Sequence, residues 1–123
     1  TVMSPASLEA SYRASGALCA AVDAAFAAGT RSFCAVRPPG HHSTATEAMG
    51  FCLFNHVAVA AHHALAVHSA TRVSIVDFDV HHGNGTQDIV AHEPRIQFVS
   101  SHQSPLYPGT GRASERGVGN VVN

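Results

Sequence analysis

Two carboxylates and two imidazoles follow one short apolar run, and they carry most of the chemistry that this sequence offers. Asp77, Asp79, His81 and His82 come directly after the apolar stretch 73–76, and a glycine-rich segment follows them. A carboxylate and an imidazole two residues apart can both reach one divalent ion. Mixed nitrogen and oxygen ligation suits zinc, and iron or cobalt would also accept it. We therefore predict a metal site that includes Asp79 and His81.

The spacing of these residues gives a geometric reason for the prediction. In an extended chain, residues two apart point to the same side. Asp77, Asp79 and His81 are thus expected to face one pocket, while Phe78 and Val80 face the opposite side. A buried carboxylate at position 77 would also fix the tautomer of a neighbouring imidazole.

A second pair of histidines, His41 and His42, lies in a loop that begins with the residues RPPG. Proline and glycine at these positions exclude regular structure. A metal ion that activates water needs a base within hydrogen-bond distance, and a neutral histidine is the usual candidate. Because this pair and the Asp79 group both follow expected strands, parallel strands would bring them to the same edge of a sheet.

The remaining histidines carry weaker signals. His82 points away from the predicted ligand side, and we expect a buried ring that makes hydrogen bonds. His62, His63 and His68 lie on or beside an expected helix, where we predict that they are exposed to solvent.

The elements that must position these residues alternate between helix and strand. We expect, in order, a helix with Ser4 as N-cap and Pro5 in its first turn that ends at Gly29, a strand at 33–36, a loop at 37–50, a helix at 55–68, a strand at 73–77, a helical turn at 86–90, and strands at 96–101 and 121–122. This alternation with short connections predicts a parallel α/β sheet in one domain or part of one.

Composition excludes several classes of protein. Charged residues make up 12% of the 123 residues and the formal net charge is −1, so there is no basic footprint for nucleic acid. No apolar run approaches the roughly 18 residues of a membrane span, and no signal peptide is recognisable. The three cysteines have no CxxC spacing, which indicates reduced thiols and a cytoplasmic protein.

Four segments occur in an order that resembles a known family. They are RPPGHHS (37–43), GFCLFN (50–55), VDFDVHHGNGTQ (76–87) and SSHQSPLYPGTG (100–111). Together they resemble the zinc-dependent histone deacetylase and acetylpolyamine amidohydrolase superfamily, especially its class II-like bacterial members. The resemblance implies an arginase-like α/β fold, with a parallel sheet covered by helices. It also implies hydrolysis of acetyl-lysine or an acetylpolyamine to acetate and a free amine.

The resemblance also implies roles for the polar residues. Asp79 and His81 correspond to two of the three zinc ligands of the family. His41 and His42 correspond to its tandem histidines, with His42 as the general base. Asp77 corresponds to the carboxylate that partners His41, and a structural potassium ion is expected near it.

Further positions match the family outside this group. Asn84 stands where class I members have an Asp that pairs with the second histidine. Phe51, next to Gly50, and Tyr107 correspond to the substrate-binding walls of the acyl-lysine tunnel. Ser100 is an additional candidate ligand of the potassium ion.

The family pattern extends beyond this chain. Its third zinc ligand, an Asp, and the Tyr that polarises the substrate carbonyl lie downstream of Asn123, and some N-terminal residues of the domain also fall outside. We therefore interpret residues 1–123 as the central, incomplete part of one deacetylase-like domain, and we expect its exposed strand edges to favour self-association.

Two other functions are compatible with the sequence. The first is a truncated or degenerate domain that binds a partner or an acetylated ligand without turnover. The second is a dinuclear manganese ureohydrolase on the same fold, but the HHGNG sequence after Asp79 lacks the further carboxylates that such a site needs.

Overall fold

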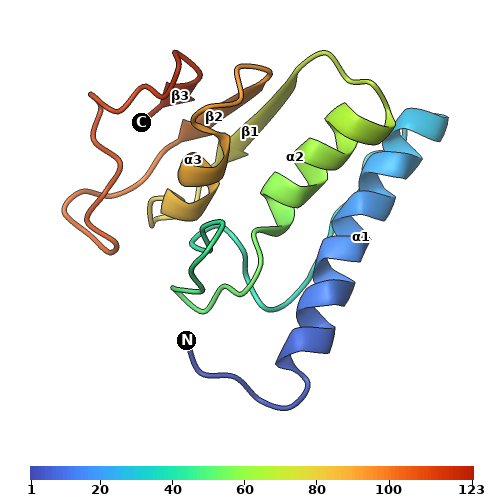
Figure 1. Cartoon of the computed structure of the whole chain (residues 1–123), viewed down its shortest axis with the longest axis horizontal. Helices are drawn as coiled ribbons and strands as arrows, with labels where there is room; N and C mark the ends of the chain where they lie inside the picture. Colours follow the sequence, from blue (N-terminus) through green and yellow to red (C-terminus); the bar gives the residue numbers. More distant parts are fainter.

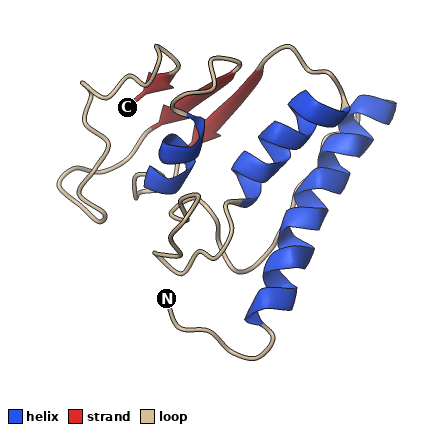
Figure 2. Cartoon of the chain, in the orientation of Figure 1, coloured by secondary structure: helices blue, strands red, loops and turns tan.

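The computed structural model describes all of residues 1–123 as a small parallel sheet with two helices packed on it and the N-terminal helix packed on one of these (Figures 1 and 2). The elements are α1 (Ser7–Ala28), α2 (His56–Val67), β1 (Val73–Asp77), α3 (Asn84–Val90), β2 (Ile96–Ser100) and β3 (Val121–Val122). The strand order is β1-β2-β3 and both pairings are parallel. The predicted α/β class with a parallel sheet is therefore confirmed. None of the helices combines the length and the apolar character needed to cross a bilayer.

The predicted bounds hold best where the apolar pattern is strongest. β1 is found where it was predicted. The predicted helix at 55–68 is α2, and the first and last predicted residues, Asn55 and His68, are its N-cap and C-cap. β2 ends at Ser100, one residue before the predicted end. α3 begins at Asn84, two residues earlier than predicted, because the backbone N–H of Gln87 already bonds the carbonyl of residue 83.

Two predictions near the N-terminus were wrong. The first helix begins at Ser7 with Ala6 as N-cap, because Ser4 instead closes a turn in which its carbonyl accepts from the Ser7 N–H at 3.1 Å. Residues 33–36 form no strand. A strand needs a neighbour for its backbone hydrogen bonds; this segment has none, and Phe33 is 93% exposed.

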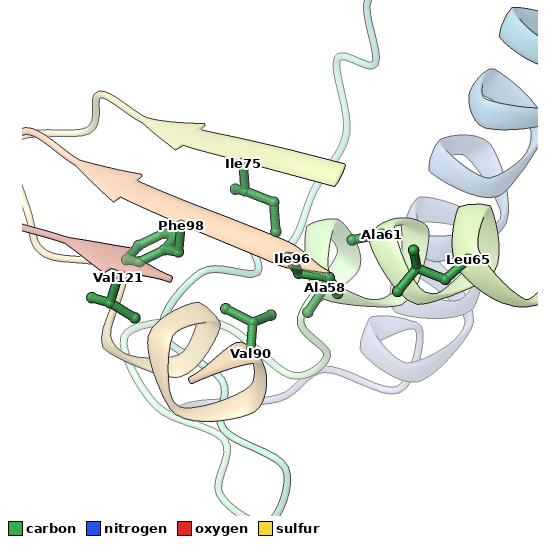
Figure 3. Close-up of a cluster of buried hydrophobic side chains, with 8 residues drawn as sticks. All are labelled: Ala58, Ala61, Leu65, Ile75, Val90, Ile96, Phe98 and Val121. Carbon is green, nitrogen blue, oxygen red and sulfur yellow. The ribbon is translucent and has the colours of Figure 1, made fainter. Parts of the chain in front are cut away.

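The core lies between the sheet and the helices α2 and α3 (Figure 3). It is a cluster of eight buried apolar side chains: Ala58, Ala61, Leu65, Ile75, Val90, Ile96, Phe98 and Val121. Alternate residues of each strand contribute to it, as the period of two in a strand requires. Phe98 is fully buried in it, and truncation of such a side chain to Ala costs about 3–5 kcal/mol.

The opposite face of the sheet is open in this chain. Val76 is 65% exposed and Val122 is 40% exposed, and the polar side chains of Ser74 and Gln97 bond each other across this face at 3.2 Å. The helices therefore cover one face of the sheet, and α1 packs on α2 (Figure 1).

Asn55 connects α2 to the loop that carries the two adjacent histidines. Its side-chain oxygen caps α2 by accepting from the Ala58 N–H at 3.2 Å. Its amide nitrogen donates to the Ser43 carbonyl at 3.0 Å and to Thr86 Oγ1 in α3 at 3.1 Å. Thr86 in turn donates its backbone N–H to the His41 carbonyl at 3.1 Å. These bonds hold the histidine loop against the carboxyl end of β1.

Candidate active site

The chain turns sharply where β1 ends, and this turn brings Asp79 and His81 together. Asp77 Oδ1 accepts from the Asp79 N–H at 3.1 Å, and Asp79 Oδ1 accepts from the His81 N–H at 2.8 Å. The expectation of an extended segment through His81 was therefore wrong, since β1 stops at Asp77 and side chain-to-backbone bonds shape the turn. Phe78 is 88% exposed, so it packs against none of these groups to any large extent.

Asp79 and His81 present two metal-ligating atoms close together. Asp79 Oδ1 lies 3.0 Å from His81 Nδ1, and both side chains are about half exposed. Ligand atoms at about 2.0–2.2 Å from a tetrahedral zinc ion are about 3.3 Å apart, so this pair fits one ion. Burial alone would raise the pKa of the Asp79 carboxyl, but the hydrogen bonds from His81, together with the charges of His41 and His81, outweigh burial and lower that pKa.

His41 forms an ion pair with the carboxylate at the end of β1. Its Nδ1 lies 2.8 Å from Asp77 Oδ2, and both side chains are largely buried. Burial disfavours the imidazolium, but the hydrogen bond and the charge of Asp77, together with Asp79, raise the pKa of His41 overall. A Cβ at Gly83 would lie 2.2 Å from Asp77 Oδ2. The pair therefore requires glycine at position 83.

His42 is oriented by an amide. Its Nδ1 lies 2.8 Å from Asn84 Oδ1, and the Asn84 amide nitrogen donates to Met49 Sδ at 3.4 Å. This arrangement turns the amide oxygen toward His42, so Nδ1 carries the proton and donates it to Asn84. The other ring nitrogen, Nε2, makes no hydrogen bond within the protein and keeps its lone pair.

The environment of His42 favours the neutral imidazole. Burial lowers its pKa, and this effect, together with the positive charges that His41 and His81 can carry, outweighs the opposing contribution of the Asn84 hydrogen bond. The pKa of His42 therefore lies below its ordinary value, whereas that of His41 lies above it. The different partners of the two adjacent histidines thus shift their pKa values in opposite directions.

Four aromatic rings meet at this edge of the sheet. The rings of His41 and His42 are 4.0 Å apart, and that of His42 lies 5.9 Å from the His81 ring. Tyr107 stands edge-on to both, 5.1 Å from His42 and 6.3 Å from His81. The structure therefore brings the predicted base, the predicted metal ligands and one predicted substrate wall into one group.

The other predicted substrate wall is less closely placed. Gly50 has φ 55° and lies against His42, where a Cβ would approach the ring to 2.3 Å, so position 50 requires glycine. Phe51 also has a positive φ of 65°, and its side chain is 78% exposed. The structure brings Phe51 into no ring contact with Tyr107.

The predicted potassium residues lie on neighbouring strands. Asp77 pairs with Ser100 in the register of β1 and β2. Ser100 Oγ lies 2.8 Å from His102 Nδ1, and the Asp77 carbonyl accepts from the Ser101 N–H at 2.9 Å. The potassium site stays a prediction.

Several residues behind the site were not found by sequence reasoning. Met49 orients Asn84 although 35 residues separate them, and no local pattern marks a thioether for that task. Cys52 Sγ accepts the backbone N–H of His42 at 3.4 Å, and burial raises the pKa of the Cys52 thiol, which therefore stays protonated.

The prediction for His82 was right, since its ring is buried between Thr110 Oγ1 at 2.8 Å and a glutamine oxygen at 2.9 Å.

Comparisons with known proteins place the whole chain in one family. Residues 1–123 match the family model described as "Histone deacetylase domain". The chain is 49% identical over 112 residues to "Histone deacetylase 14, chloroplastic" of Arabidopsis thaliana, and the aligned region covers 86% of this chain and 26% of that protein. It is 41% identical over 121 residues to "Probable deacetylase" of Methanothermobacter thermautotrophicus, which covers 97% of this chain and 36% of that protein.

A solved structure agrees with the sequence matches. The crystal structure of the HDA15 HD domain superimposes with a TM-score of 0.87 at 43% sequence identity, and it covers 93% of this chain and 35% of that chain. The chain thus spans about a third or less of the relatives that it matches. From the site, the fold and these matches together, the chain belongs to the histone deacetylase domain family.

Proposed function

We propose that the protein that carries this chain hydrolyses an acetylated amine, either acetyl-lysine or an acetylpolyamine, to a free amine and acetate. One observation carries the proposal. A two-residue metal-ligand pair, Asp79 and His81, faces a neutral histidine, His42, whose Nε2 is free to accept a proton. Membership of a deacetylase family supports amide hydrolysis as the reaction.

The residues of this chain have distinct tasks in the proposed reaction. Asp79 and His81 would hold a zinc ion, which when bound acts as a Lewis acid toward the substrate carbonyl. His42 Nε2 removes a proton from the attacking water while Asn84 holds the opposite ring nitrogen. The water oxygen bonds to the acetyl carbon, the carbon–nitrogen bond breaks, and the proton passes to the leaving amine. Asp77 keeps His41 in place beside this base.

The remaining parts of the machinery follow from the family resemblance. A third zinc ligand, an Asp, and a Tyr that stabilises the oxyanion are expected downstream of Asn123. Within this chain, Tyr107 and the Gly50–Phe51 segment would line the passage for the acyl group. The edge-on contact between the rings of Tyr107 and His42 supports this role for Tyr107.

The test is acetate release by the complete protein from an acetyl-lysine peptide and, separately, from an acetylpolyamine. General bases contribute about 10²–10⁴-fold to rate, so His42→Ala should lower kcat by that factor. The matched control is His62→Ala, which removes an exposed imidazole from α2 and should leave kcat unchanged.

Two results would contradict the proposal. Full activity of His42→Ala would remove the assigned base. Saturable binding of the acetylated ligand by the wild-type protein without acetate release would favour the non-catalytic alternative.

A further inference from the structure

A second group of metal-ligating side chains lies between α1 and α2. Asp23 in α1 faces His63 in α2 and His68 at the end of α2. The Nε2 atoms of both histidines lie 2.6 Å from the same atom, Asp23 Oδ1. The three ligand atoms all lie within 4.8 Å of one another. The expectation that His63 and His68 are exposed to solvent was therefore wrong. Helix α1 packs beside α2 (Figure 1), and its Asp23 carboxylate hydrogen-bonds both rings.

Neighbouring rings hold the two imidazoles in this orientation. His68 stacks on Phe26 with ring centroids 4.5 Å apart and planes 8° apart. His63 stands edge-on to His68 at 5.6 Å. The two rings are thus preorganised toward one point before any ion arrives, which lowers the entropy cost of binding.

Protonation of the rings is compatible with metal binding. In the metal-free group each Nε2–H donates to Asp23 Oδ1. The Nδ1 atoms of His63 and His68 make no hydrogen bond within the protein, so each neutral ring can carry its proton there and offer the Nε2 lone pair. Both histidine side chains are 22% exposed and that of Asp23 is 52% exposed, so an ion can enter and water can complete its coordination.

The donor set selects the class of ion. Two imidazole nitrogens and one carboxylate oxygen suit zinc, cobalt or nickel, whereas calcium and magnesium prefer oxygen ligands alone. We propose that Asp23, His63 and His68 form a site for a divalent transition-metal ion that clamps the C-terminal ends of α1 and α2 together. This site is separate from Asp79 and His81 and does not depend on the proposed hydrolysis.

The test uses the complete protein dialysed against Co²⁺ alone, with bound cobalt counted per protein molecule. The double variant His63→Asn/His68→Asn should bind one equivalent fewer than the wild type. The matched control is His62→Asn, which changes the adjacent, outward-facing histidine of α2 and should leave the count unchanged.

A third variant keeps the proposal testable if the double variant fails to fold. Asp23→Asn retains an oxygen that accepts from both rings but removes the anionic ligand, so the dissociation constant for Co²⁺ should rise at least about tenfold. Acetate release should be the same in Asp23→Asn and wild type, which separates this site from the catalytic one. An equal cobalt count in the wild type and a folded double variant, or unchanged affinity in Asp23→Asn, would overturn the proposal.

Discussion

At the scale of single residues, Asn84 decides the chemistry of the histidine pair. His41 faces a carboxylate and has a raised pKa, while His42 faces an amide and has a lowered pKa. A carboxylate in place of the amide would stabilise the imidazolium of His42. The neutral partner therefore keeps His42 able to accept a proton near neutral pH.

The variant Asn84→Asp tests this reasoning in the complete protein. The new carboxylate raises the pKa of His42, so the base form appears only at higher pH and the acidic limb of kcat/KM moves upward in pH. A pH–rate profile measures the shift. The control Gln97→Glu adds the same charge on the open face of the sheet and should not move the limb. An unmoved limb in Asn84→Asp would contradict the role of His42.

At the scale of elements, Asn55 joins α2, α3 and the histidine loop. One side chain caps α2, holds the Ser43 carbonyl next to His42, and contacts Thr86 in α3. Because the Asn55 side chain is buried, water cannot take its place as the hydrogen-bond partner of these groups when the side chain is removed. The position of the histidine loop relative to β1 thus depends on hydrogen bonds that link different elements of the fold.

Two substitutions of Asn55 separate its capping from its bridging contribution. Asn55→Ala should lower the free energy of unfolding by about 2–4 kcal/mol, the sum of a lost cap and an unsatisfied carbonyl. Asn55→Ser keeps a good cap but is too short to reach Ser43, so it should recover about 1 kcal/mol of that loss. Urea unfolding of the complete protein measures both. Wild-type stability in Asn55→Ala would refute the bridging role.

At the scale of the whole molecule, the sheet has one packed face and one open face. The packed face carries the core residues, while Val76 and Val122 on the other face are 65% and 40% exposed. Apolar side chains gathered on a sheet face favour association with another surface. A chain poor in charge, with 12% charged residues, offers little repulsion against it.

The 123-residue chain on its own should therefore self-associate at micromolar concentration, as measured by light scattering. The double variant Val76→Lys/Val122→Lys should shift the population toward monomer, because it places two charges on the open face. Val67→Lys, at the end of α2 and 60% exposed, is the control and should leave association unchanged. A monodisperse wild-type monomer would disprove this prediction.

Features that depend on neighbouring residues could be predicted from the amino-acid sequence. β1 and α2 follow from apolar runs and the parallel class follows from the alternation of helix and strand, since these signals act within a short stretch of chain. The spacing of Asp79 and His81 also indicated that their side chains lie together, as their 3.0 Å contact shows, while their role as metal ligands stays a prediction. The strand expected at 33–36 failed because a strand also needs a partner, which local sequence does not reveal.

Contacts between side chains that are distant in the sequence could be seen only in the folded chain. His41 and Asp77 are separated by 36 residues, and the amide of Asn84 takes its orientation from Met49, 35 residues away. Asp23 reaches its two histidines across 40 and 45 positions because α1 packs on α2. Such contacts depend on how whole elements pack, and the packing is set by the summed burial of many side chains rather than by the residues that finally touch.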